Sequence, residues 1–271
     1  MKGRSSHLYG FCSVLAGIVF WQIGYNLLST TVYFKALAIN LFLASPLQIA
    51  QSFTRLLSNG ELLTNAYASF TAFSYGYFLA VVVGIPLGLL MASFKKINYY
   101  LDPWASFLYA TPRVALAPVL IIWFGLGIFS KALIVFLGAV FPILLNTYTG
   151  IKSVRENLIE VIKAFGGSTM QVFFKVMIPD ALPAIIAGLR LAVGRAVIGV
   201  VVAEWFGAEA GLGNMVYVYS QVFRPAPVFV GILVLIVFGN FTFVLLEWFQ
   251  RWVSPWSQFQ AEKQMGEFGM D

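Results

Sequence analysis

A chain of 271 residues with 60% hydrophobic and only 10% charged side chains differs from soluble proteins, in which about a quarter of residues are charged. No polar stretch is long enough to form a soluble domain, so residues 1–271 are predicted to be a single transmembrane domain. The net charge of +6 is interpreted as the positive-inside bias of a membrane protein and not as a nucleic-acid surface. One cysteine and one histidine exclude an intrachain disulfide and supply little for zinc or histidine chemistry.

The first part of the chain is expected to hold two membrane spans and a short surface helix. Residues 8–28 form an apolar run of about the length of one transmembrane helix, too long for a cleaved signal peptide. Residues 36–44 are apolar over only half that length, so they are expected to lie in the interface or to re-enter the membrane. Residues 46–59 are predicted as a short amphipathic helix. No formal charge occurs over 62–94, which favours a second span near 70–92.

Four further spans are predicted in the rest of the chain. A polar turn at 95–102 precedes a third span at 104–129, and later spans are expected at 132–151, 184–205 and 225–246. Three residues interrupt the third span: Pro112, Arg113 and Pro118. A small-xxx-small pair occurs in the second span: Gly84 and Gly88. Such a pair permits close helix packing, but it also arises by chance in a glycine-rich chain.

The distribution of basic residues predicts the orientation in the membrane. Six spans place both termini on one side. The basic residues on or near that side are Lys2, Arg4, Lys95, Lys96, Arg113, Lys152, Arg155, Lys163, Lys175, Arg190, Arg251 and Lys263. The basic residues on the opposite side are Lys35, Arg55, Lys131 and Arg224. Because basic residues accumulate on the cytoplasmic side, both termini are expected in the cytoplasm.

Residues 152–183 form a charged loop between the fourth and fifth spans, and this loop is expected to be a docking element. Ser153 is predicted to cap a helix, with Glu156 closing the capping box. Gly166 follows an apolar helical face and is expected to end that helix. A second short amphipathic piece is predicted at 170–178, ending at a proline. The loop is therefore expected to be a helix–turn–helix on the cytoplasmic side.

The loop also carries a family pattern of the form Glu-Ala-Ala, three residues, Gly, nine residues, Ile-x-Leu-Pro. The matching residues are Glu160, Gly166, Val176, Ile178 and Pro179. With this pattern the chain resembles the permease subunits of bacterial ATP-binding-cassette (ABC) importers. Matches to the nitrate/sulfonate/taurine/bicarbonate branch are Asp102-Pro103, Thr111-Pro112, Pro118, Trp123-Phe124-Gly125, Phe141-Pro142-Ile143, Gly188-Leu189-Arg190, Ala203-Glu204 and Gly211-Leu212-Gly213. The resemblance covers residues 62–252. Val161 and Ile162 depart from the pattern by replacing its two alanines, so looser helix packing is expected there.

The resemblance implies a fold and a set of partners. The expected fold is an all-α membrane protein with six transmembrane helices and a cytoplasmic coupling-helix loop, as in type I ABC importer permeases. The expected partners are a second permease copy, two cytoplasmic ATPases, an extracytoplasmic solute-binding protein and membrane lipid, with no nucleic acid. The expected location is the bacterial inner membrane. The residues that would couple to the ATPase are Glu160, Ala164, Phe165, Gly166 and Pro179.

The chain lacks the motifs of an enzyme. No G-x-x-x-x-G-K-[ST] phosphate-binding loop occurs, and the nearest stretch, 166–169, lacks the lysine that would reach the phosphates. No nucleophile elbow, metal-binding helix or dinucleotide fingerprint occurs either. We therefore expect no cofactor in this chain, and the resemblance implies that partner ATPase subunits bind ATP and magnesium.

Two charged residues of the fifth span are candidates for the substrate pathway. Arg195 lies near the middle of the span, where an arginine normally faces a cavity or a partner. It is interpreted either as a cation that lines a path for an oxyanion or as half of an internal ion pair with Glu204 of a second copy. Glu204 lies near the outer end of the span, as an interfacial charge or as a contact of the binding protein or pathway. Arg190, early in the span, can extend its side chain to the cytoplasmic surface.

The predicted function is the permease subunit of an ATP-driven, binding-protein-dependent importer for a small anion such as nitrate, an alkanesulfonate, taurine or bicarbonate. One alternative is an ion-gradient-driven transporter or channel, although few acidic or histidine relays lie within the spans. A second alternative, within the same family, is a thiamine-precursor-like or other small organic solute.

Overall fold

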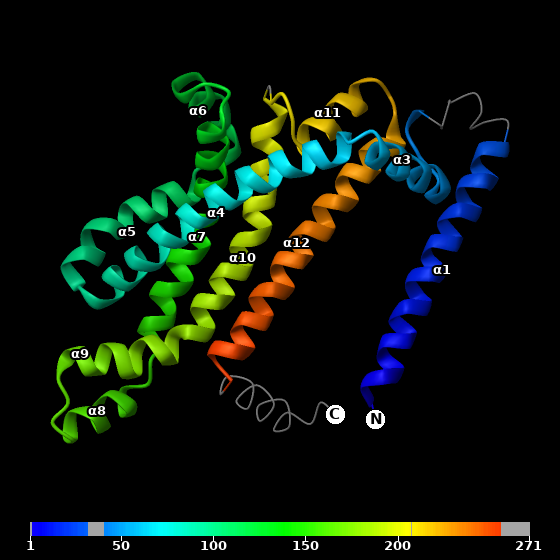
Figure 1. Ribbon diagram of the computed structural model, residues 1–271. Coiled ribbons are helices and arrows are strands. Elements are labelled where there is room, and N and C mark those ends of the chain that lie inside the picture. Colours follow the sequence, from blue (N-terminus) through cyan, green and yellow to red (C-terminus); the bar gives the residue numbers. More distant parts are fainter. Residues whose placement is uncertain (1, 32–40, 207, 256–271) are drawn as a thin grey trace. The chain divides into compact units, whose positions relative to one another are not determined.

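The computed structural model describes residues 2–31, 41–206 and 208–255, and these residues are largely helical (Figure 1). The chain divides into two compact units. The first comprises Met1–Ser69 and Gly207–Ile236, and the second comprises Phe70–Phe206 and Val237–Asp271. The described residues contain no β-strand. The predicted all-α class is therefore confirmed.

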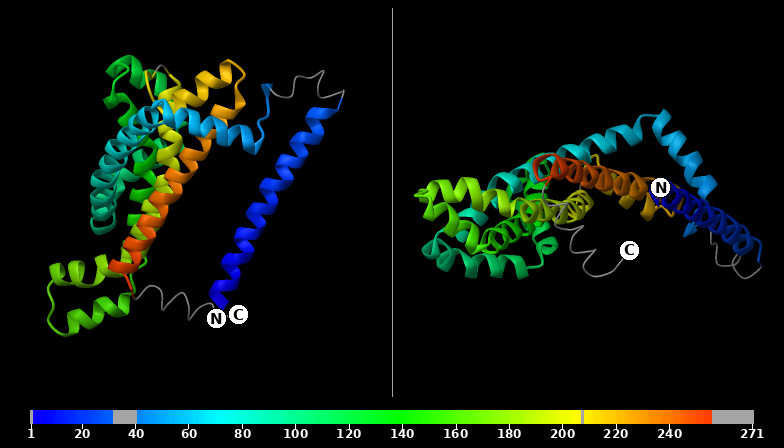
Figure 2. Two further views of the ribbon diagram at one scale, coloured as in Figure 1. Left: turned by 45° about the vertical axis from the view of Figure 1, so that its right-hand side comes forward. Right: turned by 90° about the horizontal axis from the view of Figure 1, so that it is seen from below.

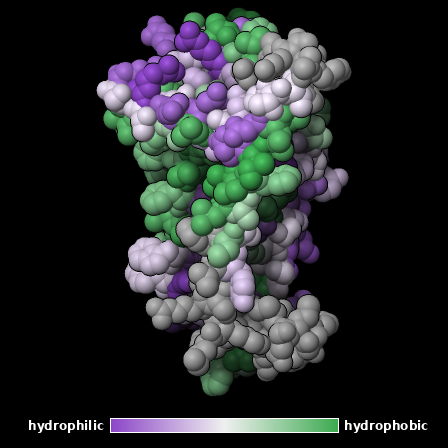
Figure 3. Space-filling view, turned by 90° about the vertical axis from the view of Figure 1, so that its right-hand side faces the viewer, coloured by the Kyte–Doolittle hydropathy of each residue, from purple (hydrophilic) through white to green (hydrophobic). Residues whose placement is uncertain are grey.

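Five helices among the described residues are long and apolar enough to cross a membrane. These candidate spans are Cys12–Thr30, Glu61–Ser93, Ile128–Lys152, Thr169–Trp205 and Pro225–Val253. A sixth is formed if Lys95–Ala110 and Arg113–Phe124 count as one span that is bent by 87°. On the face drawn in Figure 3, hydrophobic side chains cover much of the surface. The prediction of a multi-spanning membrane protein is confirmed.

The first unit is held together by hydrogen bonds between short helices. Its elements are α1 (Lys2–Thr30), α3 (Pro46–Ser58), α11 (Leu212–Gln221) and the first turns of α4 (Glu61–Ser93) and α12 (Pro225–Val253). Helix α3 begins with a capping box, in which the N–H of Gln48 donates to Ser45 Oγ at 3.2 Å and the N–H of Ser45 donates to Gln48 Oε1 at 2.9 Å. The amphipathic helix predicted at 46–59 is confirmed. Most of the expected interfacial segment at 36–44 lies outside the described residues.

Gly211 directly precedes α11. The N–H of Gly211 donates to Asn65 Oδ1, and the N–H of Leu212 donates to Ser69 Oγ, each at 2.8 Å. These side chains of α4 thereby satisfy donors at the start of α11, which have no partner within that helix. Polar residues at the start of α4 thus hold the start of α11, and α4 is one continuous helix from Glu61 to Ser93.

The second unit is built around a pair of adjacent helices, α7 (Ile128–Lys152) and α10 (Ile178–Trp205). They lie side by side in both views of Figure 2. Their buried side chains form one apolar core, to which α7 contributes Val135, Ala139 and Ile143 and α10 contributes Ala192, Ala196 and Val200. The small residues on α10 allow the helix axes to approach closely, as in other membrane helix pairs.

Glycines bring the backbones of these helices together. A Cβ atom on Gly188 would lie 2.6 Å from Asn146 Cβ, and one on Gly138 would lie 2.9 Å from the carbonyl oxygen of Arg195. The predicted glycine pair of α4 packs in the same way against α7. A Cβ on Gly84 would lie 3.0 Å from Ile143 Cγ2, and one on Gly88 would lie 2.6 Å from a backbone oxygen. The structure therefore supports the packing interpretation of the Gly84–Gly88 pair.

The predicted third span is sharply broken. Helix α5 (Lys95–Ala110) ends because Thr111 precedes a proline and adopts an extended conformation, with ψ of 133°. A 3-10 turn, Arg113–Leu116, then leads into α6 (Ala117–Phe124). The polar turn predicted at 95–102 is wrong, because these residues form the first turns of α5. The break between α4 and α5 is at Phe94, and the charged residues at 95–102 lie on α5.

Candidate functional site

The loop between α7 and α10 is a helical hairpin at the end of α7 that is remote from α6 (Figure 1). Helix α8 (Glu156–Ala164) is followed by α9 (Thr169–Val172), a π-helical turn (Phe173–Met177) and then α10. An ion pair joins its two ends, since Arg155 Nη2 lies 3.3 Å from Asp180 Oδ1. Both side chains are partly exposed, so this pair contributes little to stability. The predicted helix–turn–helix is present.

Two details of the predicted hairpin are wrong. The residue at the N-cap position of α8 is Arg155, and its side chain makes no capping hydrogen bond. Ser153 Oγ instead donates to the carbonyl of Gly150 at 3.0 Å, in the last turn of α7. The second helix also does not end at Pro179. Helix α10 continues through it, because Pro179 occupies the first turn, where a backbone N–H is not needed.

Two consecutive glycines make the turn between α8 and α9. Gly166 has a φ of +75°, which side-chain-bearing residues rarely adopt, and no atom lies within 4 Å of a Cβ built on it. Gly167 has a different role, because a Cβ there would lie 2.4 Å from Ile162 Cγ2. The next residue, Ser168, caps α9 in a capping box with Gln171. The turn is thus fixed by both backbone conformation and packing.

Helix α8 has one buried face and one exposed face. Leu158, Ile159 and Ile162 pack against an apolar cluster that includes Val154 and Val176. On the outer side Glu160 and Ala164 are exposed. The exposed apolar side chains of the hairpin, which we call the hairpin patch, are Val161, Phe165, Met170 and Phe174. Phe165 is 88% exposed. An exposed apolar patch with charged neighbours is typical of a protein interaction site.

Pro179 lies on a small hollow beside the hairpin patch. The hollow measures about 260 Å³, and Val161, Ile162, Val176 and Pro179 help to line it. It occurs at the two positions where the sequence departs from the family pattern. The looser packing expected at Val161 and Ile162 thus coincides with a hollow in the structure. The predicted coupling residues Glu160, Ala164, Phe165, Gly166 and Pro179 all belong to this hairpin or to the start of α10.

The two charged residues predicted for the pathway lie in different surroundings on α10. Arg195 is on an exposed face of the helix, next to Leu191 and Ile198, which are 61% and 52% exposed. No carboxylate pairs with Arg195 among the described residues. Glu204, in contrast, is fully buried, with 0% exposure. Glu204 thus lies inside the chain, whereas Arg195 lies at its surface.

A cavity of about 300 Å³ opens beside Arg195, and it contains a second arginine that sequence analysis did not identify as a site residue. Arg113 reaches it from the 3-10 turn after α5, while Gly138 of α7 and Ile198 of α10 form other parts of the lining. In the sequence, the cluster of Pro112, Arg113 and Pro118 indicated a broken span. It did not indicate which residues of other helices would lie beside Arg113.

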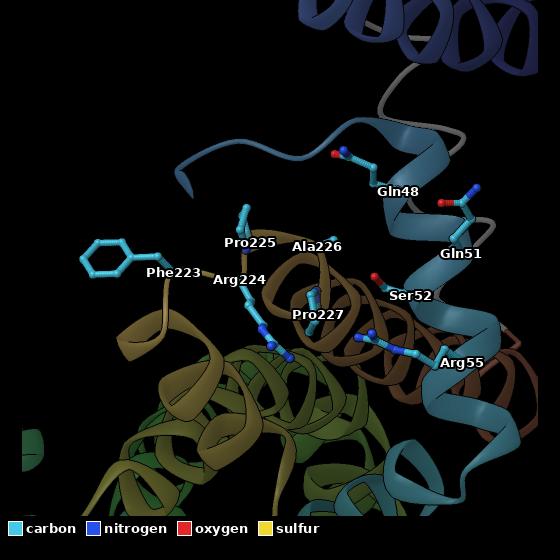
Figure 4. Close-up of a pocket in the computed structure, with 9 residues that line it drawn as sticks. All are labelled: Gln48, Gln51, Ser52, Arg55, Phe223, Arg224, Pro225, Ala226 and Pro227. Carbon is cyan, nitrogen blue, oxygen red and sulfur yellow. The ribbon is translucent and has the colours of Figure 1, made fainter. Parts of the chain in front are cut away.

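A further cavity of about 470 Å³ lies in the first unit (Figure 4). Gln48 and Arg55 line it from α3, and Arg224 lines it from the segment before α12. Figure 4 shows both guanidinium groups directed into the space between these segments. Both arginines also act electrostatically on Tyr219, whose pKa is raised above its ordinary value by burial and by its hydrogen bond to Glu61. Among the described residues, no group of three or more His, Cys, Asp or Glu side chains is arranged to hold a metal ion.

Comparison with known proteins places the chain in a transport family. Residues 84–255 match the family described as binding-protein-dependent transport system inner membrane component. The chain belongs to this family, and it is therefore a multi-pass inner-membrane permease subunit of a binding-protein-dependent transport system. The predicted function class is confirmed.

Relatives agree with this assignment, and a solved structure shares the fold. The chain is 34% identical over 241 residues to SsuC of Bacillus subtilis, described as a transport permease protein for aliphatic sulfonates, covering 88% of this chain and 84% of SsuC. It is 35% identical to the formylaminopyrimidine transport permease protein ThiX of Halalkalibacterium halodurans, covering 80% of this chain and 87% of ThiX. An inward-facing structure of the MetNI methionine ABC transporter has the same fold, with a TM-score of 0.61 at 19% identity, covering 69% of this chain and 93% of the matched chain.

Proposed function

We propose that the chain is the permease of an ATP-driven importer and that the hairpin between α7 and α10 transmits the work of separate ATPase subunits. The observation that carries this proposal is the hairpin patch, in which Phe165 and its neighbours expose apolar surface instead of burying it. Glu160 adds a negative charge beside the patch. A partner that covers the hairpin patch would remove apolar surface from water, which favours binding, and the hairpin would not need to rearrange.

The proposed assembly is a homodimer of this chain with two cytoplasmic ATPases, which bind ATP and magnesium, and an extracytoplasmic solute-binding protein. Residues 1–271 act as one transmembrane domain, with a core at 62–252 and the coupling loop at 152–183. Both termini and the loop face the cytoplasm. The support for this orientation is the excess of Lys and Arg at the termini and in the loop, together with the family of the chain.

The proposed substrate is a small anion, such as nitrate, an alkanesulfonate, taurine or bicarbonate. Arg195 supports this class, because a cation in the middle of a span without a carboxylate partner among the described residues favours a negatively charged solute. The sulfonate relative agrees with an anion, and the formylaminopyrimidine relative favours a small organic solute instead. Arg195 and Glu204 are both proposed as pathway residues, Arg195 near the middle of the helix and Glu204 near its outer end.

Reconstituted uptake tests the source of energy. The complete complex in liposomes, with its binding protein and ATPase subunits, should import solute only when hydrolysable ATP is present on the ATPase side. Glu160→Lys should reduce this uptake at least about tenfold, because reversing one charge in a protein interface costs more than about 1.4 kcal/mol. The measurement is radiolabelled solute uptake, with assembled complex quantified by gel filtration.

The same liposomes test the alternative function. A proton or sodium gradient without ATP should drive no uptake. Uptake that follows an ion gradient in the absence of ATPase subunits would show a secondary transporter and would overturn the proposal.

A further inference from the structure

We infer that the cavity between Arg113 and Arg195 is a binding site for a small oxyanion that carries a short apolar group. The inference rests on the proposed function, because it names the ligand class of a site on the proposed pathway. It adds Arg113 as the second cation of that site and adds the bend after α5 as the element that positions it.

Arg113 is held in one orientation by aromatic rings. Its guanidinium carbon lies 5.3 Å from the centroid of the Tyr109 ring and 5.7 Å from that of Phe141. Contact with ring faces orients the planar guanidinium and attracts its charge. The Nη1 atom of Arg113 is buried and has no hydrogen-bond partner in the described part of the chain. Because buried donors are nearly always satisfied, this atom indicates an acceptor that occupies the site in use.

The charges that face the cavity are both positive. Arg113 and Arg195 line the same cavity, so their like charges repel each other. None of the described residues that line the cavity is acidic, and the ion pairs among the described residues involve other arginines. Two cations within a membrane-spanning region are costly unless an anion or water accompanies them. An oxyanion removes the repulsion and can accept paired hydrogen bonds from each guanidinium fork.

The rest of the lining indicates what accompanies the charge. Four aliphatic side chains line the cavity: Val114, Ile134, Ile198 and Val202. A bare inorganic anion would leave this apolar surface in contact with water, whereas a short alkyl group would cover it. The volume of about 300 Å³ lies at the lower limit of ordinary ligand sites. The ligand class is therefore a compact organic oxyanion, with a sulfonate or carboxylate head and a short apolar tail.

The break in the span helps to place both arginines on one cavity. The chain bends by 87° between α5 and the segment Arg113–Phe124, and the 3-10 turn at the start of that segment packs against α7. Gly138 permits the close approach of α7 and α10 at this level, because a Cβ there would lie 2.9 Å from the Arg195 carbonyl oxygen. The bend and the glycine together bring Arg113, α7 and Arg195 to one cavity.

Direct binding to the complete complex in lipid nanodiscs tests the site, with no binding protein or ATP present. The probes are 1-butanesulfonate, nitrate and uncharged 1-butanol, measured by isothermal titration calorimetry. Butanesulfonate should bind saturably and more tightly than nitrate, and butanol should not bind. Arg113→Gln and Arg195→Gln should each weaken butanesulfonate affinity by about tenfold or more, since each removes a charge-assisted hydrogen bond. Arg251→Gln, outside the cavity, is the matched control and should leave the affinity unchanged.

Two outcomes would overturn the site. One is the absence of saturable butanesulfonate binding, and the other is unchanged affinity in Arg113→Gln. If Arg113→Gln does not assemble, Arg113→Lys decides, because it keeps the charge but loses the planar fork and should still bind more weakly. ATP-driven uptake by the same preparation separates the two proposals. Uptake without binding at the cavity would reject the site and leave the importer function intact, whereas loss of ATP dependence would reject the function itself.

Discussion

Phe165→Glu is expected to abolish transport while the permease still folds and inserts into the membrane. Phe165 is 88% exposed, so a charged side chain there displaces no internal contact. In a docked ATPase, however, the same charge would be buried without a partner, which typically costs several kcal/mol. Uptake should fall at least about a hundredfold, because every 1.4 kcal/mol changes an equilibrium about tenfold. The measurement is ATP-dependent uptake, together with the fraction of ATPase subunit that co-purifies.

A matched variant separates loss of docking from loss of folding. Phe165→Leu keeps the apolar surface of the hairpin patch and should retain most of the uptake. The melting temperature of the isolated permease should be the same for both variants. Normal uptake by Phe165→Glu would show that the hairpin patch does not contact the ATPase and would contradict the proposed coupling role.

Gly188→Ala is expected to destabilise the second unit, although alanine is the better helix former. A Cβ on Gly188 would lie 2.6 Å from Asn146 Cβ and 3.0 Å from the Pro142 carbonyl oxygen, which belongs to the backbone of α7. Helices α7 and α10 must therefore separate, at a cost of about 1–3 kcal/mol for overpacking. The expected result is a lower melting temperature in detergent and less assembled complex.

Gly239→Ala is the matched control for this prediction. The Cβ built on Gly239 lies 3.7 Å from Val197 Cγ2, which is an ordinary van der Waals contact. The same chemical change should therefore be neutral or slightly stabilising, because alanine has the higher helix propensity. Equal stability of the two variants would mean that α7 and α10 do not pack as closely as the structure shows.

Features with a local cause were predictable from the sequence. The membrane span in α4 was predictable, because a charge-free run of this length is typical of a span. The start of α3 was predictable as well, because its capping box is formed by residues close together in the sequence. The turn at Gly166 was also expected, because its φ of +75° is a backbone property that glycine supplies. These features depend only on neighbouring residues, so a pattern is enough to find them.

Features that depend on competing or distant contacts were not predictable. Ser153 has the sequence of a helix cap, but its hydroxyl bonds to the last turn of α7 instead. Pro179 has the sequence of a helix end, but it occupies a first turn, where proline is tolerated. The presence of Arg113 and Arg195 on one cavity depends on both the bend after α5 and the packing of α7 on α10. No local pattern contains those two conditions.

The continuity of α10 has a geometric consequence for how the hairpin and the cavity communicate. The helix runs unbroken from Ile178, beside the hairpin, to Trp205, and Arg195 lies on it about 26 Å beyond Ile178 at about 1.5 Å per residue. The π-helical turn before it holds an extra residue in its hydrogen-bonded ring, and such turns are places where a helix can change its register. A change of register there would rotate α10 about its own axis. Every side chain on the helix would then turn through the same angle, so residues about 26 Å away would in part set the direction of the Arg195 guanidinium.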